Sequence, residues 1–117
     1  MRGSLLLLSA LVATPTAADV DSAFITRLSM SVVKVRALAT NGKTLLGSGV
    51  VVGPDEVLTN CHVTRDARSV AIVKSALNFN VYSQKADVEH DLCLLRTDPM
   101  PLRPVAVRSL TSVKPGE

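Results

Sequence analysis

Short alternating apolar segments, separated by tight turns, are the feature that most restricts the fold of this chain. The segment SVVKVRAL (31–38) alternates Val33 and Val35 with lysine and arginine, which is the two-residue period of a half-buried β-strand. Asn41-Gly42 follows it, and this dipeptide is a strong hairpin signal because both residues tolerate positive φ. These residues predict a β-hairpin.

The rest of the chain also consists of short apolar segments separated by turns. Gly53-Pro54-Asp55 predicts a second turn, and later segments are rich in β-branched and aromatic residues. DLCLLRT (91–97) is a nearly unbroken apolar run, typical of a strand deep in a sheet or barrel. Short strands with no helix between them predict an all-β, antiparallel sandwich or barrel. The predicted strands are residues 31–38, 43–52, 56–60, 69–75, 79–88, 91–97 and 105–107.

The first 18 residues have the pattern of a signal peptide. Met1-Arg2 gives a positive start, an apolar run follows, and Pro15-Thr16-Ala17-Ala18 supplies small residues before a cleavage site. A membrane anchor is the alternative, but the apolar run is about half of the ~20 residues that a spanning helix needs. No later stretch is apolar enough to span a membrane. We therefore expect a periplasmic or secreted protein.

Removal of 18 of the 117 residues leaves 99, enough for one small domain. Residues 19–30 are expected to form an N-terminal helix or linker, because Val20, Phe24 and Leu28 have helical spacing and Asp21 or Ser22 could cap the helix. Residues 31–117 are expected to form a single β-barrel.

Charge and aromatic content argue against nucleic-acid binding. The formal net charge is +3, and it falls to +2 without Arg2. Only Phe24, Phe79 and Tyr82 are aromatic, so base-stacking platforms are not expected.

Polar residues that could take part in catalysis lie at two strand ends. His62 closes one strand, and Asp91 opens another with His90 beside it. A carboxylate bound to one imidazole nitrogen fixes the tautomer and leaves the other nitrogen free as a base. His62 and Asp91 are thus a candidate base and orienter; the alternatives are a core histidine bonded to backbone and an aspartate that caps a strand. We expect His90 to be exposed and assign it no role.

Cys61 and Cys93 lie beside these residues. A Cys61 nucleophile served by His62 is disfavoured, because successive side chains of an extended segment point apart. A zinc site of Cys61, His62, His90 and Cys93 lacks the usual C-x-x-C spacing. One disulfide is permitted in an exported chain, and two free thiols are the remaining alternative.

The segments GSGVVVGPDEVLTNCHV (47–63) and DLCLLR (91–96) resemble the first half of a trypsin-like serine protease. The similarity is strongest to the bacterial exported branch of the high-temperature-requirement (HtrA-like) proteases. MSVVKV resembles the strand that opens the first barrel there, and SLTSVKPGE resembles the linker between the two barrels. The resemblance covers about residues 29–117.

This resemblance implies an antiparallel Greek-key β-barrel, the first of two, with His62 and Asp91 as catalytic residues. It implies protein or peptide substrates and a reaction without metal or cofactor. In such folds the catalytic aspartate accepts hydrogen bonds from backbone near the histidine, so Cys61 would lie close to Asp91. A Cys61–Cys93 disulfide is therefore favoured over free thiols.

The sequence departs from the family at the nucleophile. The family's G-N-S-G-G or G-D-S-G-G loop lies in the second barrel, and no such loop occurs here. Ser48 stands between two glycines, but we interpret it as a small residue at a barrel bend. We therefore expect a fragment or truncated form without the second barrel, inactive alone. The alternatives are a non-catalytic single barrel that binds a protein or peptide at a sheet edge, and then a metal-binding domain.

Overall fold

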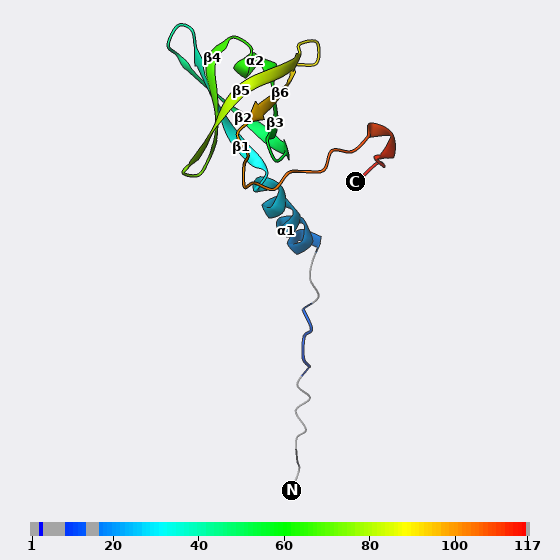
Figure 1. Cartoon of the computed structure of the whole chain (residues 1–117). Coiled ribbons are helices and arrows are strands. Elements are labelled where there is room, and N and C mark those ends of the chain that lie inside the picture. The colour runs from blue at the N-terminus through cyan, green and yellow to red at the C-terminus, as the bar shows by residue number, and fades with distance from the viewer. Residues whose placement is uncertain (1–2, 4–8, 14–16, 117) are drawn as a thin grey trace.

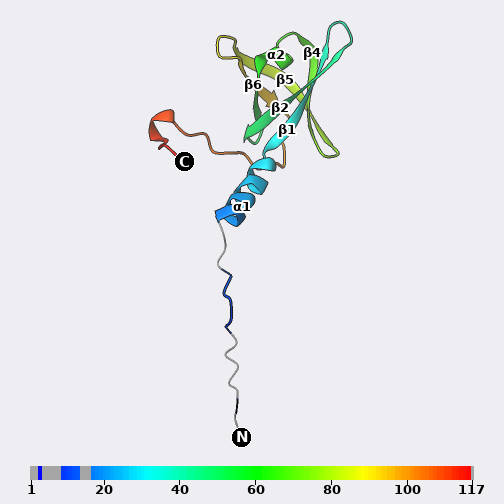
Figure 2. The ribbon, with the colours of Figure 1, turned by 180° about the vertical axis from the view of Figure 1, so that it is seen from behind.

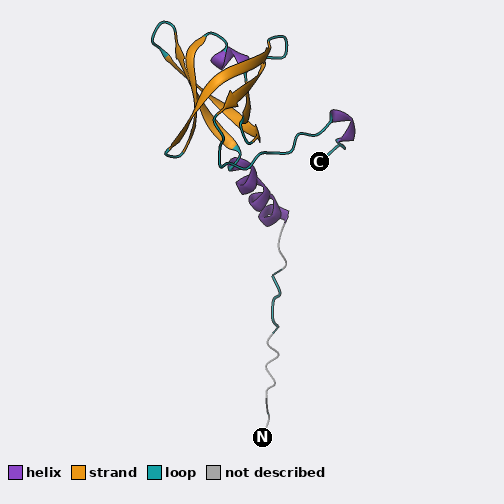
Figure 3. Cartoon of the chain, viewed as in Figure 1, coloured by secondary structure: helices purple, strands orange, loops and turns teal. Residues whose placement is uncertain are grey.

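The computed structural model describes residues 3, 9–13 and 17–116. In this part of the chain six strands form a closed barrel, preceded by one helix (Figures 1 and 3). The elements are α1 (Ala17–Ser29), β1 (Val32–Ala39), β2 (Thr44–Gly53), β3 (Glu56–Thr59), α2 (Cys61–Thr64), β4 (Ala67–Lys74), β5 (Leu77–Asp87), β6 (Leu92–Thr97) and the 3-10 helix η1 (Leu110–Ser112).

The strands are antiparallel and follow the order β1-β2-β3-β6-β5-β4 around the barrel. The sheet closes because β1 pairs with β2 on one side and with β4 on the other. β3 pairs with β6 instead of with β4, its successor in the chain, which is a Greek-key connection. The predicted all-β antiparallel barrel is confirmed.

Alternating residues of each strand fill the barrel. In β1, Val33 and Val35 point inward and are at most 2% exposed, while Lys34 between them is exposed. This is the half-buried alternation predicted from the sequence. The buried core cluster consists of Val33, Val35, Val51, Val57, Cys61, Ile72, Cys93, Leu95 and Met100.

The predicted turns are present. Asn41-Gly42 lies between β1 and β2, where Asn41 Oδ1 accepts a hydrogen bond from the backbone N of Lys43 and Gly42 takes a φ of +82°. Gly53 pairs with Glu56 across the second turn, so residues 54 and 55 reverse the chain. Turn chemistry therefore sets the order of the first three strands.

One strand prediction is wrong. Residues 105–107 form no strand; only the backbone N of Val105 is bonded to the barrel, to the carbonyl of Val51 at 2.9 Å. The strand predicted at residues 91–97 is present as β6, in which Cys93 and Leu95 are fully buried while Leu92 is 41% exposed. A barrel wall has one face in the core and one face outside, so even a continuous apolar strand alternates in burial.

The predicted N-terminal helix is present but begins earlier than expected. α1 starts at Ala17, so Asp21 and Ser22 lie inside it and the cap prediction is wrong. The helix projects from the barrel (Figures 1 and 2), and Phe24 and Ile25 are 58% and 63% exposed. α1 therefore adds little to the core.

The predicted signal peptide (1–18) falls largely outside the described residues, which include only residues 3, 9–13, Ala17 and Ala18 of it. Among the described residues, no helix combines the length and the apolar character needed to cross a membrane.

Candidate active site

His62 lies on α2, a one-turn helix at the end of the barrel away from α1 (Figures 1 and 2). Cys61 and Thr64 fix this helix, since both are buried in the barrel. Thr64 Oγ1 donates to Gln84 Oε1 at 2.9 Å, and Gln84 Nε2 donates to the Thr64 carbonyl at 3.3 Å. Because its neighbours point inward, the His62 side chain points out of the barrel and is 69% exposed.

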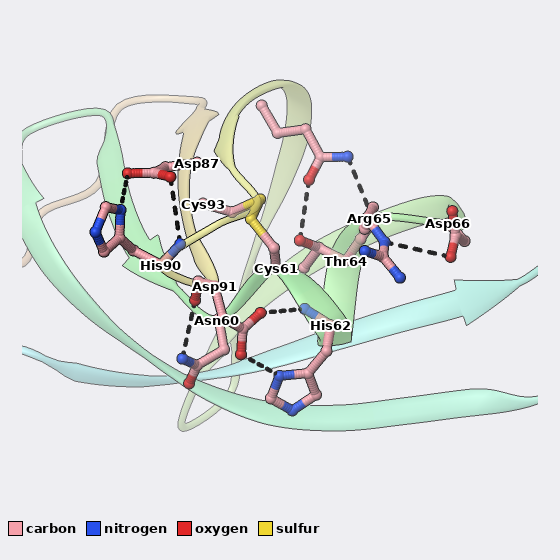
Figure 4. Close-up of a disulfide and its surroundings, with 11 residues drawn as sticks. Asn60, Cys61, His62, Thr64, Arg65, Asp66, Asp87, His90, Asp91 and Cys93 are labelled. Atoms are coloured by element: carbon pink, nitrogen blue, oxygen red, sulfur yellow. Dashed lines mark hydrogen bonds and ion pairs between the residues drawn. A yellow bond between two sulfur atoms is a disulfide. The ribbon is translucent and has the colours of Figure 1, made fainter.

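Asp91 approaches His62 from the turn that precedes β6. Its Oδ1 accepts a hydrogen bond from the backbone N of His62 at 2.9 Å, and its Oδ2 lies 2.6 Å from His62 Nδ1 (Figure 4). The two residues are 29 positions apart in the chain, and the barrel brings them together by pairing β3 with β6.

This geometry determines the charge of Asp91 and the tautomer of the neutral His62 ring. The hydrogen bond from the His62 side chain, followed by that from its backbone N–H, holds the pKa of Asp91 below its usual value. Asp91 is therefore a carboxylate near neutral pH, and a carboxylate only accepts hydrogen bonds. Nδ1 of His62 must then carry the hydrogen between them, so in the neutral imidazole Nε2 is the nitrogen with a free lone pair. An imidazole in this state can accept a proton from a nucleophile.

Cys61 and Cys93 form a disulfide with a Cα–Cα distance of 4.9 Å. The bridge joins the residue before His62 to the residue two after Asp91, and it lies next to the His62–Asp91 pair in Figure 4. Two sulfurs bonded to each other offer no thiolate, so the thiol-nucleophile and zinc alternatives lose their reactive or ligating atoms. Among the described residues, no group of three His, Cys, Asp or Glu side chains is placed to hold a metal ion.

His90 is exposed, as expected, but it has a partner that sequence reasoning missed. Its Nδ1 lies 2.8 Å from Asp87 Oδ2, and its backbone N donates to Asp87 Oδ1 at 3.3 Å. The His90 hydrogen bond lowers the pKa of Asp87. The D-x-x-H spacing was the available signal, because residues three apart meet in a turn. The pair is local and does not include His62.

Ser48 is exposed on β2, and its backbone carbonyl accepts a hydrogen bond from Thr59 Oγ1 at 2.7 Å. Its neighbours are glycines for a packing reason. A Cβ at Gly47 would lie 2.9 Å from Val63 Cγ2, and one at Gly49 would lie 2.6 Å from Val57 Cγ1. The Gly-Ser-Gly sequence thus allows close packing of α2 and β3 against β2. Among the described residues, the hydrogen-bond partner of the His62 imidazole is Asp91 and not Ser48.

Residues 47–117 match the family model described as "Trypsin-like peptidase domain". The serine protease Rv3671c of Mycobacterium tuberculosis is 33% identical over 95 residues, which cover 80% of this chain and 24% of that protein. The chain therefore spans about a quarter of the length of the curated relatives that it matches.

Solved structures share the fold. The active form of the M. tuberculosis Rv3671c protease superimposes with a TM-score of 0.71 at 29% identity, over 97% of this chain and 50% of that one. The serine endoprotease of Yersinia pestis gives a TM-score of 0.67 at 24% identity, over 82% of this chain and 35% of that one. Because its identity is only 24%, the likeness to the Yersinia pestis protease concerns the fold alone.

Proposed function

Because this chain belongs to the trypsin-like peptidase family, we propose that it supplies the general base and its orienting carboxylate to an exported serine endopeptidase. His62 is the base and Asp91 the orienter. The observation that carries the proposal is the pair of hydrogen bonds by which one carboxylate, Asp91, binds both the Nδ1 and the backbone N of His62, at 2.6 and 2.9 Å.

In this mechanism the Nε2 of His62 takes the proton of a serine hydroxyl as its oxygen attacks the scissile carbonyl. The imidazolium that forms is stabilised by the Asp91 carboxylate, which itself stays unprotonated. His62 then gives the proton to the leaving amine. Water repeats the sequence on the acyl-enzyme, with His62 again as base. The exposure of the His62 side chain leaves Nε2 open to such a partner.

The serine belongs, in this proposal, to a second barrel. No G-x-S-G-G sequence occurs within the 117 residues, and the solved M. tuberculosis protease is about twice the length of the matched region. Base and nucleophile would then meet across a cleft between two barrels, since the triad is defined by geometry and not by position in the sequence. The 117 residues alone would be inactive.

We propose proteins or peptides as substrates and the periplasm or the extracellular space as the location. Protein substrates follow from endopeptidase chemistry. The location is supported by the signal-peptide pattern of residues 1–18, and the Cys61–Cys93 disulfide suits an oxidising compartment.

The alternative, a single barrel that binds a peptide at a sheet edge, has less support in the described part of the chain. Each strand there has a neighbour on both sides in the closed barrel, and strand addition requires an unpaired edge. Such an edge is left only over stretches that extend past one of their partners, such as residues 44–48 of β2, which pair with β1 and not with β3.

The proposal is tested by the nucleotide sequence beyond the codon for Glu117. A second barrel of similar size would place a G-x-S-G-G loop about 40–80 residues further on, within the usual range for paired domains. An in-frame loop of this kind supports the proposal. A stop codon after Glu117, with no companion chain that carries the serine, would overturn it.

A further inference from the structure

The backbone of Asp91 adopts an unusual conformation. Its φ is +52°, in the left-handed region that residues other than glycine rarely occupy, although aspartate does so more readily than most. Such a conformation persists where the surrounding contacts determine it.

The carbonyl oxygen of Asp91 receives two hydrogen bonds from the segment that carries His62. Asn60 Nδ2 donates to it at 3.1 Å and the backbone N of Cys61 donates at 3.3 Å. On the other side, the backbone N of Asp91 donates to the Val88 carbonyl at 3.2 Å. The peptide groups on both sides of its α-carbon are thus held.

Asn60 stands at a helix-capping position, but its side chain makes a contact with another segment of the chain. It occupies the N-cap position of α2 with an extended backbone, where an asparagine side chain normally accepts a helical N–H. The Asn60 side chain makes no capping bond; it binds the Asp91 carbonyl instead. The Asp91 carboxylate in turn accepts the N–H of His62, so the two segments exchange polar contacts in both directions (Figure 4).

The disulfide ties the same two segments covalently. Cys61 immediately precedes His62, and Cys93 follows Asp91 by two residues and pairs with Thr59 across β3 and β6. Both sulfur-bearing residues are at most 1% exposed. The bridge therefore restricts movement of the His62 segment relative to the Asp91 turn from the buried side, while Asn60 does so from the exposed side.

We propose that Asn60 and the Cys61–Cys93 disulfide are positioning residues for the catalytic pair: together they hold the left-handed backbone of Asp91 so that both its carboxylate oxygens face His62. This inference rests on the proposed function and deepens it, since it identifies the contacts that fix the orientation of Asp91, which in turn orients His62. Neither Asn60 nor the disulfide touches the reacting atoms.

The Asp87–His90 pair provides an internal reference. It has the same two hydrogen bonds, one to Nδ1 and one to the backbone N, but they lie within one turn and are longer, at 2.8 and 3.3 Å. A change that loosens the Asp91 segment specifically should alter the Asp91–His62 pair and leave Asp87–His90 unchanged.

The experiment uses nuclear magnetic resonance on the 117-residue chain, in wild type, in Asn60→Ala, and in Cys61→Ala/Cys93→Ala. Carboxyl carbon shifts give the pKa of Asp91 and of Asp87, and imidazole nitrogen shifts give the tautomer of each histidine. Asn41→Ala is the matched control, since Asn41 also makes one side-chain bond to backbone, at a distant turn.

We expect the pKa of Asp91 to rise by about half a unit or more in Asn60→Ala and in the cysteine variant, because looser hydrogen bonds favour the charged form less. His62 should lose part of its Nδ1–H tautomer. Asp87 and His90 should not change, nor should any group in Asn41→Ala.

An unchanged Asp91 pKa and His62 tautomer in Asn60→Ala would overturn the proposal; this exposed position decides the matter if the cysteine variant does not fold. Equal shifts at Asp87 would overturn it as well, because they would indicate general loosening. The readouts need no substrate. The expected shifts in a chain whose gene encodes no serine-bearing barrel would support the positioning role while refuting the protease function.

Discussion

Reduction of the Cys61–Cys93 disulfide should destabilise the barrel by an amount that follows from its position. The bridge closes a loop with a sequence separation of 32 residues, and the chain-entropy relation gives about 3–4 kcal/mol for a loop of that size. Both cysteines are buried in the core cluster, so the reduced thiols stay packed and little cavity cost is added. A domain of this size has a free energy of unfolding of about 5–15 kcal/mol, so the loss is a large share of it.

The assay is urea denaturation of the oxidised protein and of the protein kept in reductant. With a slope of about 1 kcal/mol per M, the lower end for small domains, the midpoint should fall by about 3–4 M on reduction. Cys61→Ala/Cys93→Ala, in which reductant has no effect, is the control. A difference below about 1 kcal/mol, or two alkylatable cysteines in denatured, unreduced protein, would refute the reasoning.

Three further outcomes are expected. Leu95→Ala should cost about 2–5 kcal/mol in thermal or chemical denaturation because Leu95 is fully buried, whereas Leu46→Ala, at a side chain 63% exposed, should cost under about 0.5 kcal/mol; equal losses would contradict the assigned core. Gly49→Ala should cost about 1–3 kcal/mol, since its Cβ would meet Val57 Cγ1 at 2.6 Å, and unchanged stability would contradict this packing. Ionised Asp91 stabilises the folded state, because the pKa of Asp91 is lowered there; this stabilisation is present above the unfolded pKa, about 3.9, and is lost as the pH falls through the lower folded pKa. Asp91→Asn should therefore lose less stability than wild type on acidification below about pH 4. Parallel curves of stability against pH for the two proteins would show that the pair is not formed.

The strands were predictable because their signals are local. The alternation of Val33 and Val35 with charged residues, and the turn at Asn41-Gly42, need only neighbouring residues to be read. The failures occurred where tertiary context decides. Residues 105–107 have strand-like composition but make one backbone bond to the barrel. The earlier start of α1, at Ala17, has a local reason instead, because alanine is a strong helix former.

The candidate site was predictable only in part, through the motifs around His62 and Asp91 and the resemblance that they carry. The contacts that support it were not. Asn60 binds Asp91 across 31 residues and Thr64 binds Gln84 across 20, and neither pair leaves a periodic pattern in the sequence. Such contacts depend on the register between strands, which the barrel fixes only when it closes.

The central claim, that His62 is the general base of a serine protease, is tested most directly by the rate of fluorophosphonate labelling. The protein translated from the complete reading frame that contains these 117 residues is compared with its His62→Ala variant. We expect one labelled serine outside residues 1–117, with labelling slowed by about 10³-fold or more in His62→Ala. Labelling of a serine within residues 1–117, or equal rates in the two proteins, would contradict the claim.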